Sequence, residues 1–315
     1  MERRSVLPVS AAFIFGALIC SPIFAQTTWK AEHCHLLATE SEPVGPKVLI
    51  DDVVLDGTTD VAESVWKSVV SETKGEIFSG DAWVDSMKEV SLRSRLRNQG
   101  YFKADVTAEG EIVSSSPAWE HVVVHARVRG GTRYTLSGVQ FHSVYSDEHL
   151  AFSEEELRPL IPLHDRDFFS VEKVREGLEA LRRYYGSHGY IDFVPAPEPE
   201  VDEMHQQIAL VLSLQEGPQF RLGNIEIVGL DSALETGLRS KIMSGEILNY
   251  QLIADFYRDH KSELPETVLP EDIVFHRNVK ERTADALFDF RRCSQFQNLG
   301  TSIPPVPNHS ASAIW

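Results

Sequence analysis

The sequence is poor in positive charge. Lysine and arginine together number 30, against 47 aspartates and glutamates, so the formal net charge of the 315 residues is −17. A surface this acidic repels nucleic acid and anionic lipid headgroups, which argues against both as partners. A negative charge of this size is also typical of an exported protein that must stay in solution.

Long hydrophobic runs are missing after the first 25 residues. At the N-terminus, Arg3 and Arg4 precede an apolar stretch from Val6 to Ile19, and Ile23-Phe24-Ala25 supplies a cleavage site. We therefore predict a signal peptide at 1–25 and an exported, periplasmic chain without a transmembrane span. Because residues 1–25 carry a net charge of +1, the chain left after cleavage has a net charge of −18. The alternative is a membrane anchor, for which the run is short and broken by a proline and a glycine.

Cysteine is scarce, with 3 residues in the whole chain. Cys34 and Cys293 remain after the predicted cleavage, in a compartment where pairing is allowed. A disulfide between them requires a bent or compact chain, or a partner chain, and the sequence leaves this open. Residues 26–46 are predicted to form a leader segment, and the proline-rich residues 292–315 a disordered tail.

Motifs for chemistry are also missing. His33-Cys34-His35 has no Cys-x-x-Cys or His-x-x-x-His companion, so it does not predict a metal site. Gly186-Ser187-His188-Gly189 lacks the Gly-x-Ser-x-Gly pattern, and Asp165-Arg166-Asp167 suits a loop before a helix N-terminus. We predict no catalytic residues, no cofactor and no metal, and hence no enzyme; a periplasmic hydrolase is the alternative from another class.

The chain does contain a long internal repeat. Gly100-Tyr101-Phe102 recurs as Gly189-Tyr190-Ile191 about 90 residues further on, a period that fits one small domain per copy. Gly130-Gly131-Thr132-Arg133-Tyr134 recurs in the same way as Glu216-Gly217-Pro218-Gln219-Phe220. Such an array offers binding surfaces rather than one catalytic cleft.

Each copy predicts the order strand, helix, helix, strand, strand. The second is clearest: a strand at 134–141, a helix capped by Ser153 and Glu156, a helix from Ser170, and strands from Tyr190 and at 208–214. The first copy has strands at 48–55, 101–106 and 122–128, and a second helix with an untidy apolar stripe, namely Trp83, Met87, Val90, Leu92 and Leu96. The third has weaker strands near 273–276 and 284–290. The fold class is therefore α+β, with two helices on a three-stranded mixed sheet in each copy.

These residues resemble POTRA domains, the polypeptide-transport-associated modules of outer-membrane barrel-assembly and secretion proteins. The resemblance depends on Ser153–Leu157, the Tyr184-Tyr185 and Gly189-Tyr190 pairs, and Gly223–Gly229. It predicts three βααββ domains at 47–132, 133–219 and 220–291. A barrel needs at least about eight alternating strands, which the residues after Cys293 do not supply, so we expect a free accessory protein or a shortened relative.

The resemblance implies a non-enzymatic scaffold or chaperone-like module. Its partners are unfolded or nascent outer-membrane or secreted polypeptides, bound by strand addition; the alternative is a docking subunit for a separate barrel protein. A cell-division protein with the same module is a third reading, but it normally keeps an anchor and a single domain. The strand after Gly-Tyr is then the free edge, and we predict docking at the first copy's Tyr101, Phe102, Lys103, Asp105, Val106 and Thr107. In the second copy the corresponding strand contains Pro195, Pro197 and Pro199, which cannot donate backbone hydrogen bonds, so this edge is less suited to docking.

Overall fold

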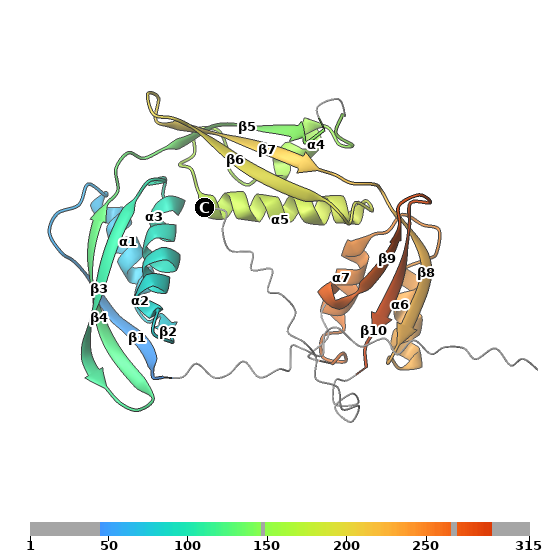
Figure 1. Cartoon of the computed structure of the whole chain (residues 1–315), viewed down its shortest axis with the longest axis horizontal. Coiled ribbons are helices and arrows are strands. Elements are labelled where there is room, and N and C mark those ends of the chain that lie inside the picture. The colour runs from blue at the N-terminus through green and yellow to red at the C-terminus, as the bar shows by residue number, and fades with distance from the viewer. Residues whose placement is uncertain (1–44, 146–148, 266–269, 292–315) are drawn as a thin grey trace, which may run out of the picture. The chain divides into compact units, whose positions relative to one another are not determined.

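The computed structural model describes residues 45–145, 149–265 and 270–291, which form three helix-covered β-sheets (Figure 1). The predicted signal peptide, the His33–His35 cluster, Cys34, Cys293 and the predicted tail lie outside these residues. The predicted α+β class is confirmed. None of the helices in the three described ranges is both long and apolar enough to cross a membrane.

The first sheet has four strands in the order β2-β1-β4-β3. Its elements are β1 (Lys47–Leu55), α1 (Glu63–Thr73), β2 (Ile77–Phe78), α2 (Trp83–Ser86), the π-helix η2 (Met87–Arg93), α3 (Ser94–Asn98), β3 (Asp105–Ser115) and β4 (Trp119–Arg129). The central strand β4 pairs parallel with β1 and antiparallel with β3. The prediction of three strands was wrong here, because the two-residue β2 is too short to leave a periodic signal.

The second sheet has the order β5-β7-β6. Its elements are β5 (Thr135–Ser143), α4 (Glu154–Leu157), the 3-10 helix η3 (Arg158–Leu160), α5 (Val171–Ser187), β6 (Val194–Asp202) and β7 (Gln207–Gln215). Ser153 and Glu156 form the predicted capping box: the Ser153 N–H donates to a Glu156 carboxylate oxygen at 2.9 Å. The Ser170 side chain caps α5 by accepting from the Lys173 N–H.

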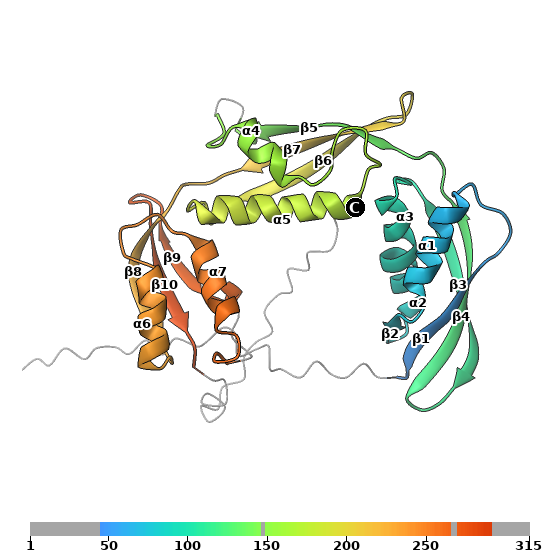
Figure 2. The ribbon, with the colours of Figure 1, turned by 180° about the vertical axis from the view of Figure 1, so that it is seen from behind.

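The third sheet has the order β8-β10-β9 (Figure 2). Its elements are β8 (Arg221–Val228), α6 (Ser232–Lys241), α7 (Tyr250–Asp259), the 3-10 helix η4 (Pro270–Asp272), β9 (Val274–Asn278) and β10 (Thr283–Asp289). Asp231 and Asn249 accept backbone N–H bonds at the starts of α6 and α7. The central strand β10 again pairs parallel with the first strand and antiparallel with the strand before it.

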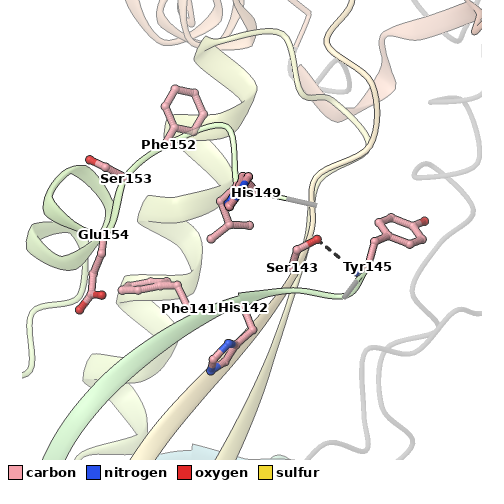
Figure 3. A pocket seen from close by; sticks show the side chains of 9 residues that line it. Phe141, His142, Ser143, Tyr145, His149, Phe152, Ser153 and Glu154 are labelled. Carbon is pink, nitrogen blue, oxygen red and sulfur yellow. Dashed lines mark hydrogen bonds between the residues drawn. The ribbon is translucent and has the colours of Figure 1, made fainter. Parts of the chain in front are cut away.

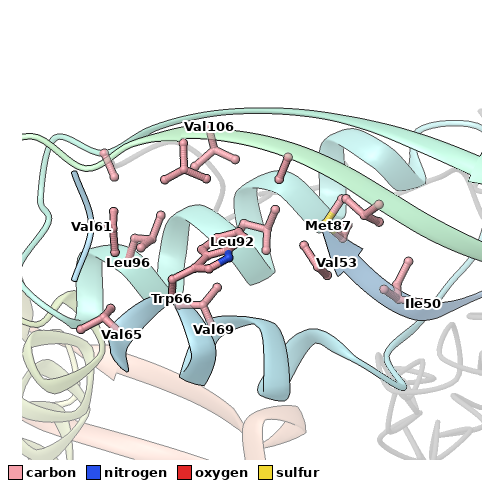
Figure 4. Packing of buried hydrophobic residues seen from close by; sticks show 14 of the residues in the cluster. Ile50, Val53, Val61, Val65, Trp66, Val69, Met87, Leu92, Leu96 and Val106 are labelled. Carbon is pink, nitrogen blue, oxygen red and sulfur yellow. The ribbon is translucent and has the colours of Figure 1, made fainter. Parts of the chain in front are cut away.

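Each sheet has its own hydrophobic core. In each, alternate residues of the central strand point toward the helices and are almost fully buried; in β7 these are Ile208, Leu210, Leu212 and Leu214. Figure 4 shows the first core, where Trp66 and Val69 of α1 and Leu92 and Leu96 of the second helix meet the sheet. The three sheets and their helices thus bury three separate sets of side chains.

The untidy stripe between Trp83 and Leu96 has a structural cause. Residues 87–93 are wound as a π-helix, so Met87 and Leu92, five residues apart, both lie fully buried. Val90, which the sequence suggested as part of the stripe, is 69 % exposed. The spacing of an α-helix therefore predicts the wrong set of buried residues in this segment.

Candidate functional site

Strand β3 forms one edge of the first sheet, and the short β2 covers the first strand on the other side. β3 spans Asp105–Ser115, and its first half packs through Val106, which is 2 % exposed. Its second half extends past the core: Ile112 and Val113 are 54 % and 52 % exposed. As a whole, β3 is the longest edge strand in the described ranges, and it contains no proline.

The predicted edge residues divide into two groups. Asp105, Val106 and Thr107 lie in β3, whereas Tyr101, Phe102 and Lys103 precede it. Tyr101 is a core residue whose hydroxyl oxygen accepts from the Ala62 N–H at 2.9 Å. The sequence prediction started the strand too early, because Gly100 and Tyr101 close the preceding helix with a turn. Their part in partner binding stays a prediction.

Phe102 and Lys103 contact the second repeat. The Phe102 ring meets Phe169 edge-to-face at 5.4 Å. The Lys103 ammonium pairs with the Glu203 carboxylate, which also accepts a hydrogen bond from the Tyr134 hydroxyl. Burial and this carboxylate raise the pKa of Tyr134 to about 12. These two side chains therefore hold neighbouring repeats together and are not part of the strand edge.

The second half of β3 is the part that sequence reasoning missed. Residues 108–115 are mostly polar or glycine, a composition that does not signal a strand. A usable signal was nonetheless present in the repeat. When Gly100 is aligned with Gly189, Val106 and Ala108 of the first repeat correspond to Pro195 and Pro197 of the second.

The prolines of β6 show which backbone groups face outward. Pro195, Pro197 and Pro199 all pair with β7, opposite Leu214, Leu212 and Leu210. A proline nitrogen cannot donate to a ladder, so these residues occupy positions whose nitrogen points away from β7. The outer edge of β6 thus lacks three successive N–H donors.

By the same alignment, the N–H groups of Val106, Ala108 and Gly110 point away from β4. Their positions in the register match: Val106 pairs with Val128 as Pro195 pairs with Leu214. The edge of β3 therefore keeps the donors that the edge of β6 has lost. Unpaired donors and acceptors in a row are what an added strand needs.

An indole ring lies on the inner face of β3. A Cβ atom at Gly110 would lie 2.4 Å from the Trp83 ring, so only glycine allows α2 to approach the strand this closely. Trp83 is partly buried against the first core. The pair Trp83–Gly110 thus fixes the helix beside the open edge.

Charged side chains mark the start of the edge. Asp105, the first residue of β3, pairs with Arg129 of β4 and lies 3.8 Å from an Arg93 nitrogen. These arginines hold the pKa of the Asp105 carboxyl below its ordinary value. Further along, the His125 ring on β4 contacts Asp56 and Glu111, each at 3.1 Å.

A hollow of about 660 Å³ lies where β5 ends and α4 begins (Figure 3). It is lined by the rings of Phe141, which lies in β5, and Phe152, which lies in the loop just before α4. Its hydroxyls serve local structure: Ser143 accepts from the Tyr145 N–H at 3.1 Å, and Ser153 belongs to the capping box. Among the residues that the structure describes, neither hydroxyl is hydrogen-bonded to a histidine that lines the hollow.

The other chemical candidates also have structural roles. The Ser187 hydroxyl donates to the Tyr184 carbonyl at 2.7 Å at the end of α5, and the His188 ring lies against the same carbonyl. Asp165 pairs with Arg158 at 3.2 Å. Among the residues that the structure describes, no group of three or more His, Cys, Asp or Glu side chains is arranged to hold a metal ion.

Comparison with known proteins identifies the repeat. The sequence profile of the POTRA family, described as "Surface antigen variable number repeat", matches residues 48–129 and 134–217. The chain belongs to the POTRA family. The two matched POTRA segments coincide with the first two sheets and their helices.

Two relatives of this POTRA chain are assembly factors by name. An outer membrane protein assembly factor of Treponema pallidum is 23 % identical over 227 residues, which cover 66 % of this chain and 26 % of that protein. The outer membrane protein assembly factor BamA of Nitratidesulfovibrio vulgaris is 23 % identical over 204 residues, covering 61 % and 24 %. The chain therefore spans about a quarter of the length of these relatives.

The fold also matches a solved structure of three POTRA modules. The crystal structure of Haemophilus influenzae BamA POTRA3-5 superposes with a TM-score of 0.56 and 19 % identity, covering 81 % of this chain and 99 % of that one. At this identity the match shows the fold alone. The POTRA recognition made from the sequence is confirmed.

Proposed function

We propose that this chain is a non-enzymatic periplasmic scaffold that binds extended polypeptides during outer-membrane protein assembly or secretion, by adding them as a strand to β3. The names of the two assembly-factor relatives support the process. The export signal predicted at the N-terminus supports the compartment. Asp105, Val106 and Thr107 start the docking strand, which continues to Ser115.

One observation carries the proposal: β3 is an edge strand with outward donors, whereas β6 is an edge strand without them. Main-chain hydrogen bonds supply affinity in strand addition, and alternate side chains supply selectivity. The exposed Ile112 and Val113 lie on this strand and offer apolar surface beside the backbone. A solvent-facing apolar strand edge without such a role is a hazard for aggregation.

The proline pattern of β6 supplies the test. Ala108→Pro removes one outward donor at a position whose equivalent, Pro197, is tolerated in the same fold. Val106→Pro does the same at the position of Pro195. We expect the double variant to fold and to bind a proline-free extended peptide at least about tenfold more weakly, since each lost hydrogen bond is worth about 1 kcal/mol.

Two controls separate the backbone from the side chain. Ala108→Val changes the side chain at the same position and keeps the N–H, so its affinity should match the wild type. Pro197→Ala restores a donor to β6 and should add weak binding there. A double proline variant with native circular dichroism and unchanged affinity contradicts the proposal.

Crosslinking identifies the partner. A photoreactive residue at position 107 or 109 lies within β3, whereas position 103 lies at the contact with Glu203. We expect capture of unfolded outer-membrane or secreted precursors at 107 and 109. Capture of only a folded barrel protein would instead favour a docking subunit.

A further inference from the structure

Arg97 is a cation whose side chain makes no hydrogen bond or ion pair with any other residue that the structure describes. It lies half-buried in α3, and its Nε is buried without a hydrogen bond. Throughout the described ranges no carboxylate or carbonyl oxygen contacts its guanidinium. A buried guanidinium nitrogen without a hydrogen bond is costly, and in native proteins it indicates a ligand, ion or water that completes it.

The charges around Arg97 favour the binding of an anion beside it. Arg93, one helical turn earlier, is a second cation on the same side of the helix, and its Nε is also buried without a partner. Burial and the Arg93 charge lower the pKa of the Arg97 guanidinium, and Glu89 partly offsets them. Glu89 itself is already bound by Arg93 through both carboxylate oxygens.

This pair of arginines lies at the beginning of the β3 edge. Arg93 reaches Asp105, the first residue of the strand, at 3.8 Å. That carboxylate is shared with Arg129, so it is not free to neutralise Arg97. Glu89, Asp105 and Asp60 thus each already interact with Arg93 or Arg129.

We propose that Arg97, assisted by Arg93, binds an acidic side chain of the polypeptide that docks on β3. The proposal rests on the proposed function, because β3 determines where the polypeptide lies. Antiparallel pairs are about two to three times as common as parallel ones, and antiparallel docking brings the C-terminal end of the added strand to Asp105. The acidic residue therefore belongs near the C-terminal end of the docked segment.

The test compares two labelled peptides. Both are short, blocked at each end, proline-free and built of alternating valine and threonine; one carries a single glutamate near its C-terminal end and the other carries glutamine there. With the full mature chain, we expect the glutamate peptide to bind about tenfold more tightly, as for one charge-assisted hydrogen bond. Fluorescence anisotropy measures both affinities.

Variants assign the preference to Arg97. Arg97→Gln should abolish the preference for glutamate and leave the affinity for the glutamine peptide unchanged, while Arg97→Lys should keep part of it. Arg183→Gln on α5 makes the same change in net charge at an exposed site and should leave the preference intact. The free energy of unfolding should not fall in Arg97→Gln, because its guanidinium has no partner inside the protein.

The outcomes separate this proposal from the proposed function. Equal affinity of the two peptides for the wild type, or equal weakening of both by Arg97→Gln, overturns the carboxylate site even if Ala108→Pro abolishes binding. An Arg97-dependent preference for glutamate that survives the β3 prolines supports a carboxylate site and overturns strand addition at β3. A preference for glutamate at the N-terminal end of the peptide overturns the antiparallel orientation.

Discussion

The backbone N–H of Tyr134 donates a hydrogen bond of 2.8 Å to the carbonyl oxygen of Gly100. The same bond, also 2.8 Å, joins Phe220 to Gly189 one repeat later. At each place the preceding side chain adds a second bond: Arg133 donates to the Gln99 carbonyl and Gln219 to the His188 carbonyl, both at 2.9 Å. Each of the two matched POTRA segments is thus followed by the same two-bond contact with the start of the next sheet.

Gly100→Ala should destabilise this contact. Gly100 has a φ of +88°, and a Cβ there would lie 3.0 Å from the Tyr134 carbonyl oxygen and 3.1 Å from the Phe168 Cβ. Gly57→Ala is the matched control, because Gly57 has the same φ and nothing within 4 Å. Both variants carry the left-handed strain of about 1–2 kcal/mol, and we expect Gly100→Ala to cost about 1–3 kcal/mol more. Equal losses in urea unfolding would show that the contact is not tight.

The charge pairs at the two contacts are reversed. Lys103 pairs with Glu203, whereas Asp192, the equivalent of Lys103 in the second repeat, pairs with Arg277 at 2.7 Å. Lys103→Glu should lower the free energy of unfolding only slightly, as expected for exposed pairs. Adding Glu203→Lys should restore part of it, because the Tyr134 hydroxyl then lacks its acceptor. A double-mutant cycle measures the coupling, and a zero coupling at low salt contradicts the pairing.

His125 should make the stability of the first module depend on pH. The imidazole N–H groups donate hydrogen bonds to the carboxylates of Asp56 and then Glu111, which raises the pKa of His125 above 6.5 in the folded state. Arg127 is another charged group nearby, 4.0 Å from Asp56. The stabilisation is complete below pH 6.5 and is lost as the pH rises through the folded-state pKa. Thermal unfolding across this range should show the decline.

His125→Gln should remove that decline. His142→Gln is its control, because the His142 ring contacts the Gln140 amide oxygen and, among the described residues, no carboxylate. A decline that persists unchanged in His125→Gln would assign it to another group.

Gly110→Ala should push Trp83 away from β3. The new Cβ would lie 2.4 Å from the indole ring, whereas a Cβ at Gly138 of β5 has nothing within 4 Å. We expect Gly110→Ala to cost about 1–3 kcal/mol and Gly138→Ala to cost nothing. Tryptophan fluorescence should change only in the first variant. An unchanged spectrum and unfolding midpoint in Gly110→Ala would contradict the packing.

The sequence predicted the class and order of elements because burial enforces a period. The alternating apolar residues of β4 and β7 and the amphipathic α5 are buried in the cores, so their patterns are clear. The repeated pairs could also be recognised in the sequence: Gly100-Tyr101 recurs as Gly189-Tyr190, and Arg133-Tyr134 as Gln219-Phe220. The structure shows that they are the two halves of one contact between modules.

The limits of the edge strand could not be predicted in the same way. Residues 108–115 of β3 protrude beyond the core, so no burial selects an alternating pattern there. The Gly-Tyr pair marks a turn, so a strand was expected four residues too early. Arg97 gave no signal at all, because its missing partner is a property of three-dimensional contacts.

Hydrogen exchange of the β3 amides measures the central claim most directly. In the free protein, we expect the amides of Val106, Ala108 and Gly110 to exchange faster than those of Thr107 and Glu109, which face β4. Saturation with the glutamate peptide should protect the first three and leave the other two unchanged. Unchanged exchange at Val106, Ala108 and Gly110 in the saturated complex would show that no strand adds to β3.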